Sequence, residues 1–155
     1  MVRTDQSFTV SAWLRFTGAT EFTLYTAVSQ DGTTNSGFLL QYMTGENVWG
    51  FSLPTTDSAA ETYVTARSSS TVALDVWTHV AGVYDATTGL LKIYVDGLLS
   101  GIVVHNNSWH AAGSLEIGRA KWHGFLGDWW RGGIDDVRVF QGALNDDEVY
   151  QLTIQ

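Results

Sequence analysis

Apolar and polar residues alternate along most of this chain. In SFTVSAWLRF, residues 7–16, the even-numbered positions are all apolar, while the odd-numbered positions are polar except for Trp13. Alternation with a period of two is typical of a strand that buries one face. Related patterns predict further strands at 22–30, 36–43, 47–53, 62–67, 76–85, 89–97, 99–105, 113–119 and 133–141.

Glycine-containing turns separate these segments. Glycine adopts the positive φ angles of tight hairpin turns without steric cost. The stretch YDATTGLLKIYVDG therefore predicts two consecutive hairpin corners around one central strand. The turns with a glycine available for positive φ are Asp31-Gly32, Thr44-Gly45, Thr88-Gly89 and Asp96-Gly97.

Helical periodicity occurs only near the end of the chain, in LNDDEVYQL. Asn145 can cap this helix, and Glu148 three positions later completes a variant of the capping box. Leu144, Val149 and Leu152 are expected to contact the sheet. Many short strands with one short C-terminal helix predict an all-β fold, a two-sheet antiparallel β-sandwich or jelly roll, as a single domain over residues 1–155.

Composition narrows the possible partners. The net charge is −8 with eight scattered Lys and Arg residues, which argues against nucleic acid and anionic membranes. No apolar run approaches the length of a membrane-spanning helix, and the absence of Cys excludes disulfides and thiolate metal sites. A low charged fraction of 15% is common in exported all-β proteins, so we expect a secreted or cell-surface protein whose targeting segment lies outside this chain.

Four segments, FTVSAW, WTHVAGVYDATTGLLKIYVDG, LEIGRA and GGIDDVRVFQGALNDDEV, resemble the laminin-G-like, concanavalin-A-like lectin/glucanase jelly-roll domains of bacterial exported proteins. The resemblance implies one concave and one convex sheet, glycan or protein binding on a loop rim or the concave face, and often a structural calcium ion. Such domains usually begin with a strand or two before FTVSAW. The chain is therefore expected either to be minimal or to be cut from a longer protein, and a missing leading strand would leave an open edge.

The last predicted strand contains a candidate calcium ligand. Strict alternation puts Asp135 on the row of Val137, where a carboxylate is costly unless it is paired or binds a metal. The resemblance to the glucanases implies calcium at Asp135 together with backbone carbonyls, and Asp31 lies in an oxygen-rich loop that can supply a second ligand. The alternative is that Asp135 accepts backbone N–H bonds or pairs with Arg138 or Arg119.

The chain contains seven Trp, and the segment KWHGFLGDWWRGG at 121–133 has three of them. Sugars stack their C–H faces on flat rings and bind planar polar groups through their hydroxyls. The alternative is that a Trp in a glycine-rich loop seals the end of the sandwich. Trp129 and Trp130 are adjacent, so we expect one ring to seal and the other to face outward. The candidate glycan-binding residues are Trp109, Trp122, Asp128, Trp129, Trp130, Tyr42 and Asn35.

Two further Trp residues and the four His residues are not assigned to the glycan-binding site. Trp49 and Trp77 are expected in the core or at its edge, and His79 is expected to pack within a strand. The remaining histidines, His105, His110 and His123, lie near the aromatic loops, but their spacing is not a zinc signature.

Catalytic signatures are largely missing from the sequence. The five Glu residues are widely separated, the glucanase E-x-D-x-x-E motif is absent, and there is neither a G-x-S-x-G elbow nor a phosphate-binding glycine loop. The leading hypothesis is a non-catalytic, lectin-like module that binds a polysaccharide or glycan and belongs to a larger exported protein. The alternatives are a protein-interaction or adhesion domain and a small polysaccharide lyase or hydrolase.

Overall fold

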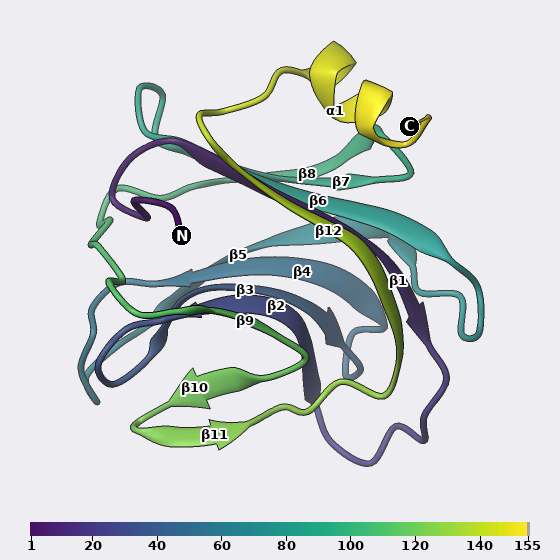
Figure 1. The fold of residues 1–155 in the computed structure, drawn as a ribbon, viewed down its shortest axis with the longest axis horizontal. Helices are drawn as coiled ribbons and strands as arrows, with labels where there is room; N and C mark the ends of the chain where they lie inside the picture. Colours follow the sequence, from purple (N-terminus) through teal and green to yellow (C-terminus); the bar gives the residue numbers. More distant parts are fainter. Residues whose placement is uncertain (155) are drawn as a thin grey trace.

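Two five-stranded antiparallel sheets pack face to face in the computed structural model, which describes residues 1–154 (Figure 1). The strand orders are β12-β1-β6-β7-β8 in the first sheet and β5-β4-β3-β2-β9 in the second. The elements are β1 Phe8–Phe16, β2 Leu24–Asp31, β3 Ser36–Met43, β4 Val48–Pro54, β5 Tyr63–Thr71, β6 Thr78–Asp85, β7 Leu90–Val95, β8 Leu98–Val104, β9 Leu115–Ile117, β10 Ala120–Trp122, β11 Phe125–Gly127, β12 Gly132–Gln141 and α1 Asp146–Leu152. The predicted all-β sandwich with a short C-terminal helix is confirmed.

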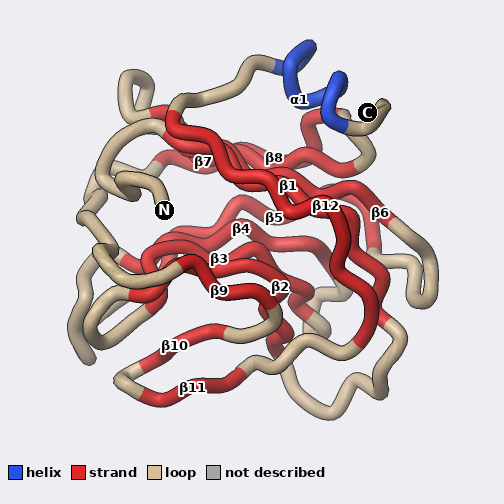
Figure 2. Tube along the Cα trace, viewed as in Figure 1, coloured by secondary structure: helices blue, strands red, loops and turns tan. Residues whose placement is uncertain are grey.

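Two additions lie outside the sandwich layers. Figure 2 shows helix α1 beyond the first sheet and the β10–β11 hairpin beyond the second. The sequence predicts every strand of the two sheets but treats 121–133 as a loop, so the hairpin was missed. Its strands are only three residues long and have apolar residues on the solvent side, which gives no alternation to detect.

Strand β1 shows how the predicted alternation builds the core. Its apolar row faces the space between the sheets and is buried. Trp13, on the opposite row, packs edge-on against the ring of His79 with centroids 5.2 Å apart. This contact explains how a large ring is accommodated on the outer face of the strand. The buried row consists of Phe8, Val10, Ala12, Leu14 and Phe16.

Turn geometry agrees with the sequence at two of the four glycines. Asp96 and Gly97 have φ angles of 49° and 80°, which suits a two-residue type I′ hairpin turn, and Gly89 has φ 68°. The prediction was wrong for Gly32 and Gly45, neither of which has positive φ among the described residues. Gly32 is instead required by space, because an added Cβ would lie 2.6 Å from the carbonyl oxygen of Asn35.

Aromatic rings fill the end of the core below the 121–133 segment. The Trp130 ring contacts Phe16 at a centroid distance of 5.3 Å and stacks near Trp49 at 6.2 Å. Trp49 is buried, as expected, whereas Trp77 lies at the edge under the guanidinium of Arg15, which is 5.3 Å from the ring centroid. Trp130 therefore seals this end of the sandwich.

Helix α1 covers part of the outer face of the first sheet, as its sequence predicts. The capping box is complete, because the Asn145 side chain accepts from the Glu148 N–H at 2.9 Å and Glu148 accepts from the Asn145 N–H at 2.8 Å. Val149 is buried against the sheet beside Tyr94, whose hydroxyl donates to Asp146 at 2.7 Å. The helix is thus attached at its cap and through its apolar face.

Candidate functional site

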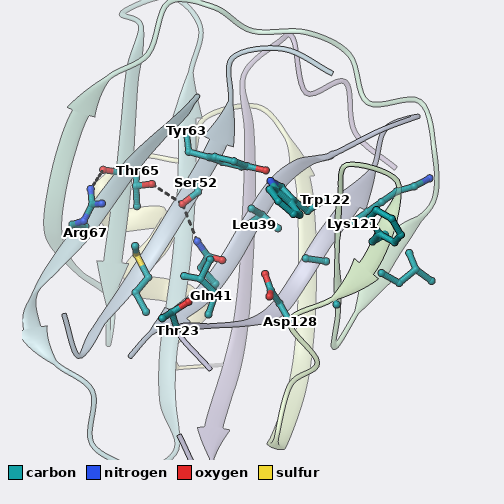
Figure 3. Close-up of a pocket in the computed structure, with 16 residues that line it drawn as sticks. Thr23, Leu39, Gln41, Ser52, Tyr63, Thr65, Arg67, Lys121, Trp122 and Asp128 are labelled. Carbon is teal, nitrogen blue, oxygen red and sulfur yellow. Dashed lines mark hydrogen bonds between the residues drawn. The ribbon is translucent and has the colours of Figure 1, made fainter. Parts of the chain in front are cut away.

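The floor of the candidate site is the outer face of the second sheet. Successive strand side chains point to opposite faces, so the residues between the core positions of β3, β4 and β5 line this outer face. The Gln41 amide donates to the Ser52 hydroxyl at 3.0 Å, and the Ser52 and Thr65 hydroxyls are 2.7 Å apart. These side chains form a polar row that crosses three neighbouring strands (Figure 3).

The wall of the site is the β10–β11 hairpin. His123 and Gly124 have φ angles of 48° and 80°, which fits a two-residue type I′ turn. Trp122 lies directly opposite Phe125 in the hairpin register, and Leu126 follows. Trp122 is 52% exposed and Phe125 74% exposed, so the hairpin presents aromatic surface to solvent beside the polar floor.

The loop between β2 and β3 holds the hairpin in place. The His123 N–H donates to the Asn35 side-chain oxygen at 3.0 Å, and the Gly124 N–H donates to the Thr34 carbonyl at 2.8 Å. The Lys121 N–H donates to the Ser36 hydroxyl at 2.9 Å. Asn35 is fully buried, so this predicted glycan-binding residue holds the wall of the site rather than lining it.

Trp122 has a fixed orientation. Its indole N–H donates to one carboxylate oxygen of Glu61 at 2.9 Å, while the His123 ring nitrogen lies 2.7 Å from the other oxygen. The Trp122 and His123 rings stack with centroids 3.7 Å apart. Burial opposes ionisation of Glu61, but the hydrogen bonds from His123 and Trp122 lower its pKa below the usual value. Glu61 is therefore a charged clamp for the aromatic wall.

A cleft of about 590 Å³ lies between the polar floor and the hairpin. Asp128 lines it in a left-handed conformation with φ 53°, and its backbone carbonyl accepts from the Thr26 N–H at 2.8 Å. Figure 3 shows Asp128 and Trp122 on the same side of this pocket, opposite Arg67. Burial raises the pKa of the Asp128 carboxyl.

Tyr63 supplies a further polar group in the cleft. Burial raises the pKa of its phenol, and the negative charges of Glu61 and Asp128 raise it further. The phenol is therefore neutral at physiological pH and can both donate and accept hydrogen bonds. The arrangement offers flat rings and hydroxyl-binding groups side by side.

The adjacent residues Trp129 and Trp130 point in opposite directions, as predicted. Trp129 is 58% exposed and forms a parallel bridge with Thr26. Trp130 packs in the core, and its indole N–H donates to the Gly133 carbonyl at 3.2 Å. The Trp129 ring is therefore accessible to a ligand, and Trp130 is structural.

Two other predicted binding residues do not line the cleft. Trp109 is half-buried, with its indole N–H donating to the Pro54 carbonyl at 2.8 Å. Tyr42 is buried in the core, and its hydroxyl donates to the Asn47 side chain at 2.9 Å. The cleft thus brings together Trp122 and Asp128 of the predicted set, with Trp129 immediately beside them.

The predicted calcium ligand Asp135 does not lie on the apolar row of Val137. A β-bulge interrupts the pairing of β12 with β1, and Asp136 in this bulge has φ 49°. The bulge breaks the alternation, so Asp135 is exposed and its carboxylate accepts from the Asp136 N–H at 2.8 Å. The expectation of a carboxylate on the core-facing row was wrong, and the alternative of a backbone N–H partner describes the local structure.

The second predicted calcium ligand, Asp31, forms an ion pair. The guanidinium of Arg119 donates to both of its carboxylate oxygens at 3.0 and 2.9 Å, in a largely buried position. Asp31 ends β2, whereas Asp135 lies in the other sheet beside Trp13 of β1 (Figure 1). Within residues 1–154, no group of three or more His, Asp or Glu side chains is arranged to hold a metal ion. Asp31 and Asp135 do not fit a shared calcium site.

Sequence reasoning missed much of the cleft. Ser52, Tyr63 and Thr65 lie on the outward rows of their strands, and Glu61 precedes β5. The alternation that identifies the core rows also identifies the outward rows. It does not show which outward row is covered by a distant hairpin, because that contact joins β10 to β2 and β3.

A family model described as the concanavalin A-like lectin/glucanases superfamily matches residues 1–150. The chain belongs to this superfamily. No match was found among curated protein sequences. No helix among the described residues of this superfamily member is long and apolar enough to cross a membrane.

Solved structures share the fold of this superfamily member at low identity. The CBM40 domain of the Ruminococcus gnavus IT-sialidase, bound to α2,3-sialyllactose, aligns with a TM-score of 0.74 and 19% identity over 96% of this chain and 83% of that chain. Domain 4 of AbnA, an extracellular arabinanase from Geobacillus stearothermophilus in complex with arabinotriose, aligns with 0.72 and 20%, over 96% and 68%. A heptameric SAP-like pentraxin from Limulus polyphemus aligns with 0.73 and 18%, over 96% and 70%.

Proposed function

We propose that this protein is a non-catalytic carbohydrate-binding module and that the cleft between the second sheet and the β10–β11 hairpin binds its glycan. The observation that carries the proposal is the fixed, half-exposed ring of Trp122 beside the polar floor at Gln41. Such a ring accepts the C–H face of a sugar, while amide, hydroxyl and carboxylate groups bind the ring hydroxyls. The sialyllactose and arabinotriose complexes of structures with this fold support the same class of ligand.

The carboxylates near the cleft favour binding over hydrolysis. Most glycosidases need two carboxyl groups that flank one glycosidic bond. Asp128 lines the cleft, whereas both oxygens of Glu61 are engaged by Trp122 and His123. Cleavage would therefore require Glu61 to leave the clamp that holds the aromatic wall.

The same proposal includes a location outside the cell, where polysaccharides are accessible. The low charged fraction of the chain and its lack of Cys are consistent with this location. The AbnA domain is also part of an extracellular arabinanase. In this proposal the domain directs a larger parent protein to its glycan. Asp31 and Asp135 do not act as ligands of the calcium ion that the family resemblance implies.

A glycan array followed by calorimetric titration tests the binding function. Trp122→Ala should lower the affinity for the bound glycan by about tenfold, since it removes the stacking surface. Trp77→Ala is the matched control, because Trp77 is also exposed but lies outside the cleft. Absence of binding to any glycan, or equal losses in both variants, would contradict the proposal. Release of reducing ends from the bound polysaccharide would show that the protein is an enzyme.

A further inference from the structure

A second cleft, of about 520 Å³, adjoins the first one. It lies on the other side of Asp128, where the chain leaves β11 and runs toward β12. The two clefts share three lining residues, so they lie side by side along the same stretch of surface. The shared residues are Thr23, Gly127 and Asp128.

Each cleft has its own exposed indole. Trp122 stands at the first cleft and Trp129 at the second, and they are 52% and 58% exposed. The backbone at Asp128 and Trp129 is tied to Thr26 of β2, through the 2.8 Å hydrogen bond to the Asp128 carbonyl and the parallel bridge at Trp129. Trp129 is therefore attached to the rigid sheet, and little order has to be gained when a ligand stacks on it.

Charges along the two clefts are mostly paired. Arg131 pairs with Glu21 at 3.1 Å in the second cleft, and Arg67 pairs with Glu46 at 2.9 Å at the far end of the first. The Lys121 ammonium donates to the Gly32 carbonyl at 3.3 Å, and Figure 3 shows this side chain directed away from the pocket. Among residues 1–154, Asp128 makes no ion pair, so the junction of the clefts has an unpaired, half-buried carboxylate.

We propose that the two clefts are successive sugar subsites of one groove, which binds an internal segment of a linear, uncharged polysaccharide. This inference rests on the proposed function and names its ligand class. One sugar stacks on Trp122 and another on Trp129, while the Asp128 carboxylate accepts hydroxyl hydrogen bonds between them. A uronate or sialate at the junction would place a second negative charge beside this poorly solvated carboxylate, so the groove disfavours acidic chains.

Ladders of neutral oligosaccharides provide the test. Linear arabinan, xylan and β-1,3-glucan fragments, from one sugar to a hexasaccharide, are titrated by calorimetry against the protein. The affinity for the preferred ladder should rise by about tenfold once a fragment spans both rings. Trp129→Ala should remove this gain and leave the affinity for the shortest binding fragment unchanged, whereas Trp129→Tyr should restore part of it. Trp122→Ala should weaken binding of every fragment.

The charge of the junction is tested with Asp128→Asn, which keeps the shape of the side chain. Oligogalacturonate should bind the unaltered protein more weakly than the preferred neutral ladder, and the Asn variant should reduce this difference. If the affinity does not depend on fragment length and Trp129→Ala does not change it, the second subsite is overturned while the proposed function stays intact. Tighter binding of oligogalacturonate than of every neutral ladder overturns the assignment to uncharged chains. Failure of all ladders and of the glycan array overturns the proposed function together with this inference.

Discussion

At the scale of single residues, the adjacent side chains of Trp129 and Trp130 have different roles, one at the surface and one in the core. The extended backbone at Trp129 and Trp130 directs one ring outward and the other into the core. The sequence predicts this division because neighbours in extended chain face opposite sides. It does not predict which ring is which, since that depends on where the core residues Phe16 and Trp49 lie.

Trp130→Ala should lower the free energy of unfolding by about 3–5 kcal/mol, because it removes a ring packed against two aromatic residues and leaves a cavity. Trp129→Ala should change the same free energy by less than about 0.5 kcal/mol, as expected for an exposed position. Chemical denaturation followed by circular dichroism measures both. A large loss of stability in Trp129→Ala would contradict the assignment of the two rings.

Two buried histidines are expected to make the stability of the fold depend on pH. Burial lowers the pKa of both His79 and His105, and neither ring nitrogen of His105 has a hydrogen-bond partner. A lowered pKa in the folded state means that the unfolded chain binds protons more readily. The stabilising contribution is therefore present above the unfolded pKa of about 6.5 and is lost as the pH falls below it.

The melting midpoint should accordingly fall when the pH is lowered through about 6.5. His105→Leu should flatten this dependence, because Leu fills the apolar space beside Tyr84 and cannot be protonated. His110→Ala is the control at an exposed position and should retain the slope of the unaltered protein. The same slope in His105→Leu would show that other groups cause the acid sensitivity.

At the scale of elements, the β10–β11 hairpin determines the site. It is a separate two-stranded sheet that contacts the main sandwich through Asn35, through Ser36 at the start of β3 and through Glu61. Its type I′ turn, His123-Gly124, is a local signal available in the sequence. Its docking on the second sheet is a long-range contact, which the period of the strands does not encode.

Glu61→Gln should loosen the hairpin, since the amide cannot provide the charged partner of His123. We expect a loss of unfolding free energy of about 1.5–3 kcal/mol, the usual range for a hydrogen bond to a charged group, together with weaker glycan binding. Faster depolarisation of tryptophan fluorescence would report the freed Trp122 ring. Glu116→Gln is the control, because its partner Arg119 lies outside the cleft. Unchanged binding would show that Glu61 does not position Trp122.

At the scale of the whole molecule, the two carboxylates that were predicted to bind calcium have other partners in separate parts of the sandwich. Arg119 joins Asp31 at the end of β2 to Glu116 of β9, with oxygen contacts of 2.9 and 3.0 Å. On the other side of the sandwich, α1 is attached through buried Val149 and through the hydrogen bond from the Tyr94 hydroxyl to Asp146. The predicted calcium ligands are thus engaged separately, one by a guanidinium and one by a backbone N–H.

The melting midpoint should be the same in EDTA, in buffer alone and in excess calcium, because Asp31 and Asp135 do not form one oxygen-rich site. Differential scanning calorimetry is the measurement. Arg119→Gln should lower the midpoint in all three conditions, since it leaves the largely buried Asp31 carboxylate unpaired. A rise of the midpoint with calcium would restore the calcium prediction and require ligands other than these two carboxylates.

Local periodicity and capping are sufficient to predict the sandwich, the C-terminal helix and the opposite orientations of two adjacent tryptophans. The site depends on long-range contacts, since Trp122, Asp128 and Tyr63 meet through the docking of a hairpin on a distant sheet face. The position of Asp135 also depends on tertiary structure, because one bulge residue in β12 breaks the alternation on which the metal prediction depended. Local rules fix which residues form strands, whereas register and docking depend on contacts between segments far apart in the chain.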